Sequence, residues 1–231
     1  MSLSGPTYSV GAVRRGFVSG VLAVAVLFAA CGGSGTNAPK ARVAVGPEGP
    51  LVKGLLTQTQ LRQVTGLSTA KVTPAQDTVL FADPDPRAPC GAKVPALPLT
   101  DAAAMSFTAD SIRGGAELLV RLPPGAAKTY LDARQANTAK GCPEYETTTH
   151  QGVKQRVLLV RVVWLYREFQ QALAVVTALK IGESVRAATQ IEVRRGDILA
   201  RTVIFTNAPI PNVAVRGIAS VMGENLRVFD E

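Results

Sequence analysis

The chain has 231 residues, 47% of them hydrophobic, and a formal net charge of +8. This length allows one domain with a hydrophobic core, and the apolar content excludes disorder throughout the chain. The Lys and Arg residues are scattered without a run of five or more, so we expect no nucleic-acid partner. A weak attraction of the positive chain to anionic lipid or polymer is a better explanation of the net charge.

Residues 1–30 are predicted to be a signal peptide. Arg14 and Arg15 precede an uncharged stretch over residues 16–30, which is too short for a membrane span of about 20 apolar residues. The stretch ends in Leu27-Phe28-Ala29-Ala30-Cys31, which resembles the bacterial lipobox, where the cysteine thiol is lipidated and the chain is cut before it. An ordinary secretory signal or an uncleaved anchor with a chance cysteine remains an alternative.

Residues 31–51 are predicted to be a flexible linker after the lipidated Cys31. They begin with a Gly/Ser-rich run and contain further Gly and Pro residues up to position 50, a composition typical of tethers. Two or more acyl chains on one cysteine anchor a protein stably. The expected location is therefore the outer face of the plasma membrane, with the membrane itself as a partner through the lipid.

Cys90 and Cys142 remain once Cys31 is assigned to lipid. Paired cysteines in an exported chain become disulfides, and closing a loop of about 50 residues stabilises a fold by roughly 4 kcal/mol. A metal site is one alternative, but two cysteines with His150 and no Cys-x-x-Cys motif make a poor set of zinc ligands. A reactive thiol pair is another, but no motif supports it. We therefore expect one disulfide, no metal and no cofactor.

The first half of the domain shows two helical and two strand-like patterns. Thr57 and Gln60 form a capping-box pattern before Leu61, which predicts a helix over residues 57–64. Residues 103–108 and 116–122 are predicted to form a hairpin. Residues 125–138 are predicted to be a helix whose apolar face is cut short by Arg134.

The second half is strand-rich. Strands are predicted at 145–149 and 153–163, whereas 161–179 fits a helix as well as strands, with a strand favoured from residue 173. Residues 186–194 and 198–205 form a hairpin across an Arg-Gly-Asp turn, and a helix follows at 212–225. The predicted fold class is α+β, an antiparallel sheet with helices packed on one face and one disulfide.

Catalytic signatures are missing from the sequence. It has no Gly-x-Ser-x-Gly, His-Glu-x-x-His or P-loop motif, and His150 is its single histidine, so we expect no enzyme activity. Trp164, Tyr166 and Phe169 form the densest aromatic group. They suit either core packing or the wall of a cleft for a hydrophobic or glycolipid ligand.

Four segments give a family resemblance through their order and spacing. They are LTQTQLRQVTG, PCGAK, YLDARQANTAKGCPEY, and VRRGDILARTVIFT with NVAVRGIASVMGENL. Together they resemble the extracellular sensor domain of PknH-type kinases, a domain that many actinobacterial and mycobacterial lipoproteins carry, here over residues 52–231. The resemblance implies a non-catalytic module that binds an undefined small-molecule or lipid ligand between sheet and helices. The alternative function is a carrier of a lipid or glycolipid at the cell envelope.

Overall fold

The computed structural model describes residues 49–74, 101–139, 144–148, 154–165, 170–181 and 183–230. The predicted signal peptide, Cys31, most of the linker, Cys90 and Cys142 lie outside these ranges. The signal, lipidation and disulfide assignments therefore stay predictions.

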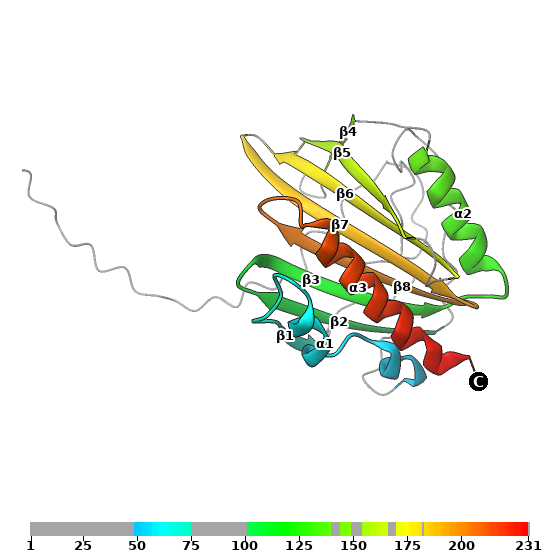
Figure 1. The fold of residues 1–231 in the computed structure, drawn as a ribbon. Helices are drawn as coiled ribbons and strands as arrows, with labels where there is room; N and C mark the ends of the chain where they lie inside the picture. The colour runs from blue at the N-terminus through cyan, green and yellow to red at the C-terminus, as the bar shows by residue number, and fades with distance from the viewer. Residues whose placement is uncertain are drawn as a thin grey trace, which may run out of the picture.

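An eight-stranded antiparallel sheet forms the centre of the domain, with strand order β1-β2-β3-β8-β7-β6-β5-β4 (Figure 1). The strands are β1 (Lys71–Pro74), β2 (Asp101–Ala109), β3 (Ile112–Arg121), β4 (Glu144–Thr148), β5 (Lys154–Trp164), β6 (Gln171–Ile181), β7 (Ser184–Arg195) and β8 (Ile198–Thr206). The β3–β8 pairing joins the early hairpin to the late strand meander, so residues far apart in sequence share one sheet.

Three α-helices and two short 3-10 helices accompany the sheet in the described ranges. They are η2 (Pro50–Gly54), α1 (Gln58–Gln63), α2 (Ala126–Ala139), α3 (Asn212–Asn225) and η4 (Leu226–Phe229). Helix α1 begins as predicted, because the Thr57 side chain accepts the Gln60 backbone N–H while the Gln60 side chain accepts the Thr57 backbone N–H.

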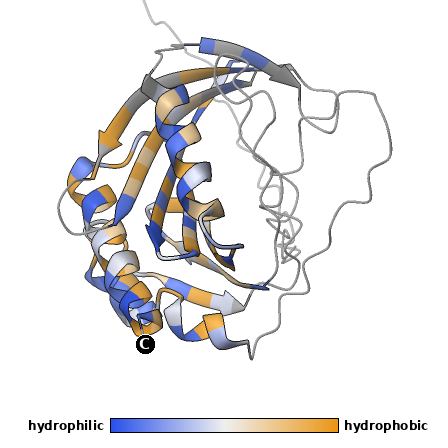
Figure 2. Ribbon diagram, turned by 90° about the vertical axis from the view of Figure 1, so that its right-hand side faces the viewer, coloured by the Kyte–Doolittle hydropathy of each residue, from blue (hydrophilic) through white to orange (hydrophobic). Residues whose placement is uncertain are grey.

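The α+β class and the antiparallel sheet are confirmed, but the prediction that all helices pack on one face is wrong. Successive strand residues point to opposite faces, and both faces are apolar. One buried cluster joins α1 and α3 to the sheet; its large members include Leu61, Phe107, Leu119, Ile191, Ile204, Ile218 and Met222. The other joins α2 to the opposite face; its members include Leu118, Tyr130, Leu131, Leu173, Leu199 and Val203. Figure 2 shows α3, which leads to the marked C-terminus, and α2 on opposite sides of the curved sheet.

The stretch at 161–179 is strand on both sides of a connection. Strand β5 runs to Trp164, and β6 begins at Gln171. Most of its residues pair with both β5 and β7, and this two-sided pairing is why the alternating pattern prevails over the helical one.

The Arg-Gly-Asp segment forms the β7–β8 turn, as predicted. Gly196 has a φ of 56°, a left-handed conformation that glycine adopts readily. The Asp197 side chain accepts a hydrogen bond from the Gly125 backbone N–H at 2.9 Å. The backbone carbonyl oxygen of Asp197 accepts one from the Leu122 N–H. The turn therefore holds the start of α2 against the sheet.

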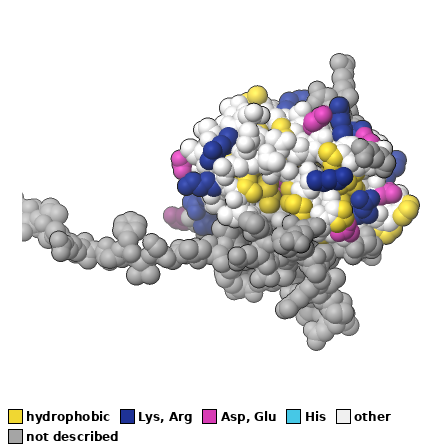
Figure 3. All heavy atoms as spheres, turned by 90° about the horizontal axis from the view of Figure 1, so that it is seen from below, with side chains coloured by type: hydrophobic (Ala, Val, Ile, Leu, Met, Phe, Trp, Pro, Cys, Tyr) yellow, Lys and Arg dark blue, Asp and Glu magenta, His cyan; other side chains and the backbone are white. Residues whose placement is uncertain are grey.

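Charged side chains on the domain surface are mixed in sign. On the face in Figure 3, Lys and Arg side chains are spread out, with Asp and Glu among them. Within the described ranges, no helix has the length and hydropathy needed to cross a membrane.

Candidate functional site

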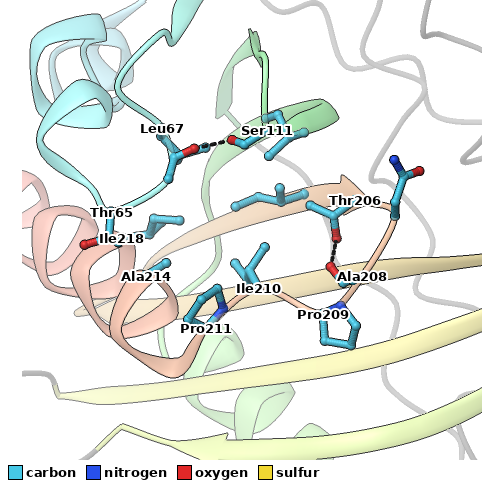
Figure 4. A pocket seen from close by; sticks show the side chains of 14 residues that line it. Thr65, Leu67, Ser111, Thr206, Ala208, Pro209, Ile210, Pro211, Ala214 and Ile218 are labelled. Atoms are coloured by element: carbon cyan, nitrogen blue, oxygen red, sulfur yellow. Dashed lines mark hydrogen bonds between the residues drawn. The ribbon is translucent and has the colours of Figure 1, made fainter.

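A pocket of about 280 Å³ opens beside the first turns of α3. Its walls come from the α1–β1 connection, the β2–β3 turn, the end of β8 and α3 itself (Figure 4). The lining residues are Thr65, Gly66, Leu67, Ser111, Ile112, Ile204, Thr206, Asn207, Ala208, Pro209, Ile210, Pro211, Ala214 and Ile218. None of them carries a charged side chain, so the pocket offers mainly an apolar surface.

The sequence of the β8–α3 connection explains where the pocket opens. Proline lacks the N–H that a strand ladder needs, and Pro209 and Pro211 follow soon after β8 ends at Thr206. The Thr206 hydroxyl donates to the Ala208 carbonyl oxygen at 2.6 Å, which fixes the first bend. The chain therefore leaves the sheet here, and Ile210 lies between the two prolines over the pocket (Figure 4).

The polar side chains at the pocket are largely engaged with the protein. Ser111 Oγ donates to the Gly66 carbonyl oxygen, and Arg113 Nε donates to Asn207 Oδ1 at 2.6 Å. Of the three hydroxyl groups in the lining, those of Ser111 and Thr206 therefore donate to backbone carbonyls, and the amide oxygen of Asn207 accepts from Arg113. The lining residues that the structure describes therefore include no carboxylate, imidazole, amine or thiol.

A buried ionic cluster lies on the opposite face of the sheet, under α2. The Glu192 carboxylate accepts hydrogen bonds from Arg134 Nε at 3.2 Å, Arg201 Nε at 2.9 Å and the Tyr130 hydroxyl at 2.9 Å. Gln190 Nε2 adds a fourth bond at 3.0 Å. The Glu192 side chain is only 1% exposed, so these contacts hold a charge away from water.

Burial alone would raise the pKa of Glu192, but the charges of Arg134 and Arg201 hold it below its ordinary value. The pKa of Tyr130 is raised, mainly by burial. Glu192 is therefore an ionised carboxylate and Tyr130 a neutral phenol at neutral pH. A fully hydrogen-bonded cluster of this kind fixes the position of α2 on the sheet, which is a structural role.

A second buried acid, Glu117 on β3, faces the α3 side. Its Oε2 accepts the Leu56 backbone N–H at 2.7 Å, while Oε1 is buried without a hydrogen-bond partner in the described part of the chain. Burial raises the pKa of Glu117 to about 8. Glu117 does not line the pocket, so its carboxyl serves to hold the η2–α1 segment.

The aromatic residues predicted to form a ligand wall are not tested by the structure. Trp164 closes β5 and pairs with Leu173 of β6. Tyr166 and Phe169 lie outside the described residues. No group of three or more His, Cys, Asp or Glu in the described ranges is arranged to hold a metal ion.

Sequence reasoning missed the pocket residues and both buried acids. The two prolines at 209 and 211 were a usable signal, since they force the chain off the sheet. The sequence held no signal for the two carboxyl groups, because their partners are distant in the chain. Glu192 and Arg134 are separated by 58 residues, and Glu117 and Leu56 by 61.

The sheet order and the helices on its two faces define an α+β domain with an apolar pocket beside α3. No protein-family profile matches the chain, and no curated protein matches it in sequence. Among solved structures, the extracellular domain of PknH from Mycobacterium tuberculosis is similar, with a TM-score of 0.50 and 12% identity. The match covers 76% of this chain and 94% of that one. At this identity the likeness establishes a shared fold, which confirms the fold expected from the four sequence segments.

Proposed function

We propose that this protein is a lipid-anchored, extracytoplasmic sensor module that binds a ligand and performs no catalysis. The observation that carries the proposal is the fold shared with the extracellular domain of PknH across 94% of that chain. The predicted signal peptide and Cys31 supply the anchor, and the linker would hold the domain off the membrane.

The chemistry of the described residues supports binding over catalysis. The buried ionisable groups are engaged in holding α2 and the η2–α1 segment, whereas the pocket carries only apolar and neutral polar groups. An enzyme site would bring a base, a nucleophile or paired carboxylates together at an open surface.

Replacing Cys31 by Ser tests the anchor. Expressed in a bacterium that processes lipoproteins, the wild-type chain should appear in the membrane fraction, and its N-terminal peptide should begin at an acylated Cys31. Cys31→Ser should move the protein out of that fraction. Ser34→Ala is the matched control, since it changes a small polar residue three positions after Cys31 and should leave the anchor in place. An unmodified N-terminal peptide in wild-type protein would contradict the proposal.

A carrier of lipid or glycolipid is the second candidate, favoured by the apolar pocket lining. Pockets that enclose a drug-sized ligand measure roughly 300–1,000 Å³, so a pocket of about 280 Å³ suits one short apolar group better than a lipid with two long acyl chains. Mass spectrometry of organic extracts from the purified protein separates the two. A carrier should release stoichiometric lipid beyond the lipid on Cys31, whereas a sensor should not.

A further inference from the structure

The pocket beside α3 has a definite chemical character. Its apolar wall consists of five isoleucine and leucine side chains, two prolines and two alanines, which are Leu67, Ile112, Ile204, Ile210, Ile218, Pro209, Pro211, Ala208 and Ala214. No ionised group is among the described residues that line it, and the hydroxyls of Ser111 and Thr206 already donate to backbone carbonyls. A charged ligand would lose its hydration here without gaining an ionic partner among these residues, and such a loss is unfavourable.

The size of the pocket limits the ligand. An apolar cavity of about 150 Å³ holds one benzene molecule of six carbon atoms. In proportion, about 280 Å³ holds a molecule of roughly ten non-hydrogen atoms. An alkyl segment of about eight carbons or a pair of fused aromatic rings has this size.

We infer that the pocket binds an uncharged, mostly apolar molecule or alkyl segment of about ten non-hydrogen atoms, held between Ile218 of α3, Ile112 of β3 and Leu67. This inference rests on the proposed role as a ligand-binding module and names the ligand class. Leu67 follows α1, and α1 follows the predicted tether, so a ligand here contacts the same chain segment that leads from the membrane.

A series of n-alkanols tests the inference on the full chain carrying Cys31→Ser, which keeps every described residue and lacks the acylated thiol. Methyl NMR signals of Ile112, Ile204 and Ile218 should shift and saturate on titration. Each added methylene contributes about 0.8 kcal/mol, or about fourfold in affinity, so affinity should rise from butanol to octanol. It should then level off at decanol, because the pocket is full. A rise that continues unchanged through decanol, or no saturable shift, would overturn the inference.

The charge of the ligand is tested with n-octanol and octanoate. Octanol should bind at least tenfold more tightly, since the pocket offers no cation to a carboxylate. Equal binding of the two would overturn the assignment to uncharged ligands.

Ala214→Leu places a larger side chain into the pocket and should weaken octanol binding at least tenfold. Val213→Leu is the matched control, because Val213 is the neighbouring α3 residue, is 61% exposed and does not line the pocket. Unchanged octanol affinity in folded Ala214→Leu would overturn the site.

Ile112→Ala provides a second test that does not depend on Ala214→Leu folding. It widens the pocket, so affinity should continue to rise from octanol to decanol instead of levelling off after octanol. If affinity in Ile112→Ala levelled off at the same alkanol as in the parent chain, the assignment of the site would be overturned.

These outcomes are separate from those of the anchoring experiment. Alkanol binding together with an unmodified Cys31 would reject the anchor and keep the pocket assignment. An acylated Cys31 without alkanol binding would keep the anchor and reject only this ligand class.

Discussion

The carboxyl group of Glu117 on β3 accepts the backbone N–H of Leu56 at 2.7 Å, across 61 residues of sequence. Leu56 lies between η2 and α1, in the segment that follows the predicted tether. One side-chain hydrogen bond from inside the core therefore attaches the N-terminal segment to the sheet.

Glu117 should make the stability of the domain fall as pH rises. Its pKa is about 8 in the folded protein against an ordinary value of 4.5, so between these values the unfolded chain loses a proton that the folded chain keeps. The free energy of unfolding should fall by up to about 1.4 kcal/mol per pH unit in this window and level off above it. Urea denaturation at pH 4.5, 6 and 8 measures the slope.

Glu117→Gln removes this titration and keeps an oxygen for the Leu56 N–H. Its free energy of unfolding should exceed that of the wild type at pH 8, and the slope should flatten. Glu183→Gln is the control, because Glu183 is exposed and should leave the slope unchanged. A wild-type slope in Glu117→Gln would show that another group titrates.

Glu192→Gln should destabilise the domain by about 3–5 kcal/mol at pH 7, because it leaves Arg134 and Arg201 buried without their counter-charge. The folded pKa of Glu192 lies below 4.5, so its contribution is present above pH 4.5 and is lost as pH falls through the folded pKa. The variant should therefore lose less stability than the wild type on acidification. Thermal unfolding at pH 7 and pH 3 measures both effects.

Asp132→Asn is the matched control for Glu192→Gln. Asp132 pairs with Lys128 on the exposed side of α2, and exposed pairs contribute less than about 1 kcal/mol. An equal loss in the two variants would contradict the structural role of the buried cluster.

Gly115→Ala should destabilise the domain by about 1–3 kcal/mol. Gly115 lies opposite Phe107 in the β2–β3 pair, and an added Cβ would overlap the Phe107 ring. In Phe107→Leu/Gly115→Ala the smaller side chain leaves room, so the double variant should be more stable than the sum of the single effects predicts. Urea denaturation midpoints decide this, with Gly49→Ala, which meets no atom within 4 Å, as the neutral control.

The predicted Cys90–Cys142 disulfide should stabilise the exported protein by roughly 4 kcal/mol. Cys90→Ser and Cys142→Ser should lower the free energy of unfolding equally, and the double variant should lose no more than either. Peptide mapping without reductant should recover the linked pair. Free thiols at both positions in native protein would reject the disulfide.

Local sequence patterns predicted the elements well. The helix over 212–225 has the same bounds in the structure, the capping box of Thr57 and Gln60 forms, and the turn at Arg195-Gly196-Asp197 joins β7 to β8. Each of these depends on residues within a few positions of one another, so the signal is contained in a short window. The missed strand β1 is four residues long and pairs only at the sheet edge with β2, which leaves too short a pattern to recognise.

Arg134 shows where such reasoning ends. In the sequence it interrupts the apolar face of a helix, but in the structure it lies on that face and pairs with buried Glu192 of β7. A charged residue at an inward position gives no sign of its partner when the partner is on another element.

The sequence by itself determined the helices, the hairpins and the antiparallel α+β class, because hydrophobic period, caps and turn residues act over short distances. The tertiary structure alone decided that α2 and α3 cover opposite faces, that Glu117 and Glu192 are buried acids with opposite pKa shifts, and that a pocket opens beside α3. These features depend on which strands pair and on which groups meet across dozens of residues, and that pairing is set by the packing of the whole domain.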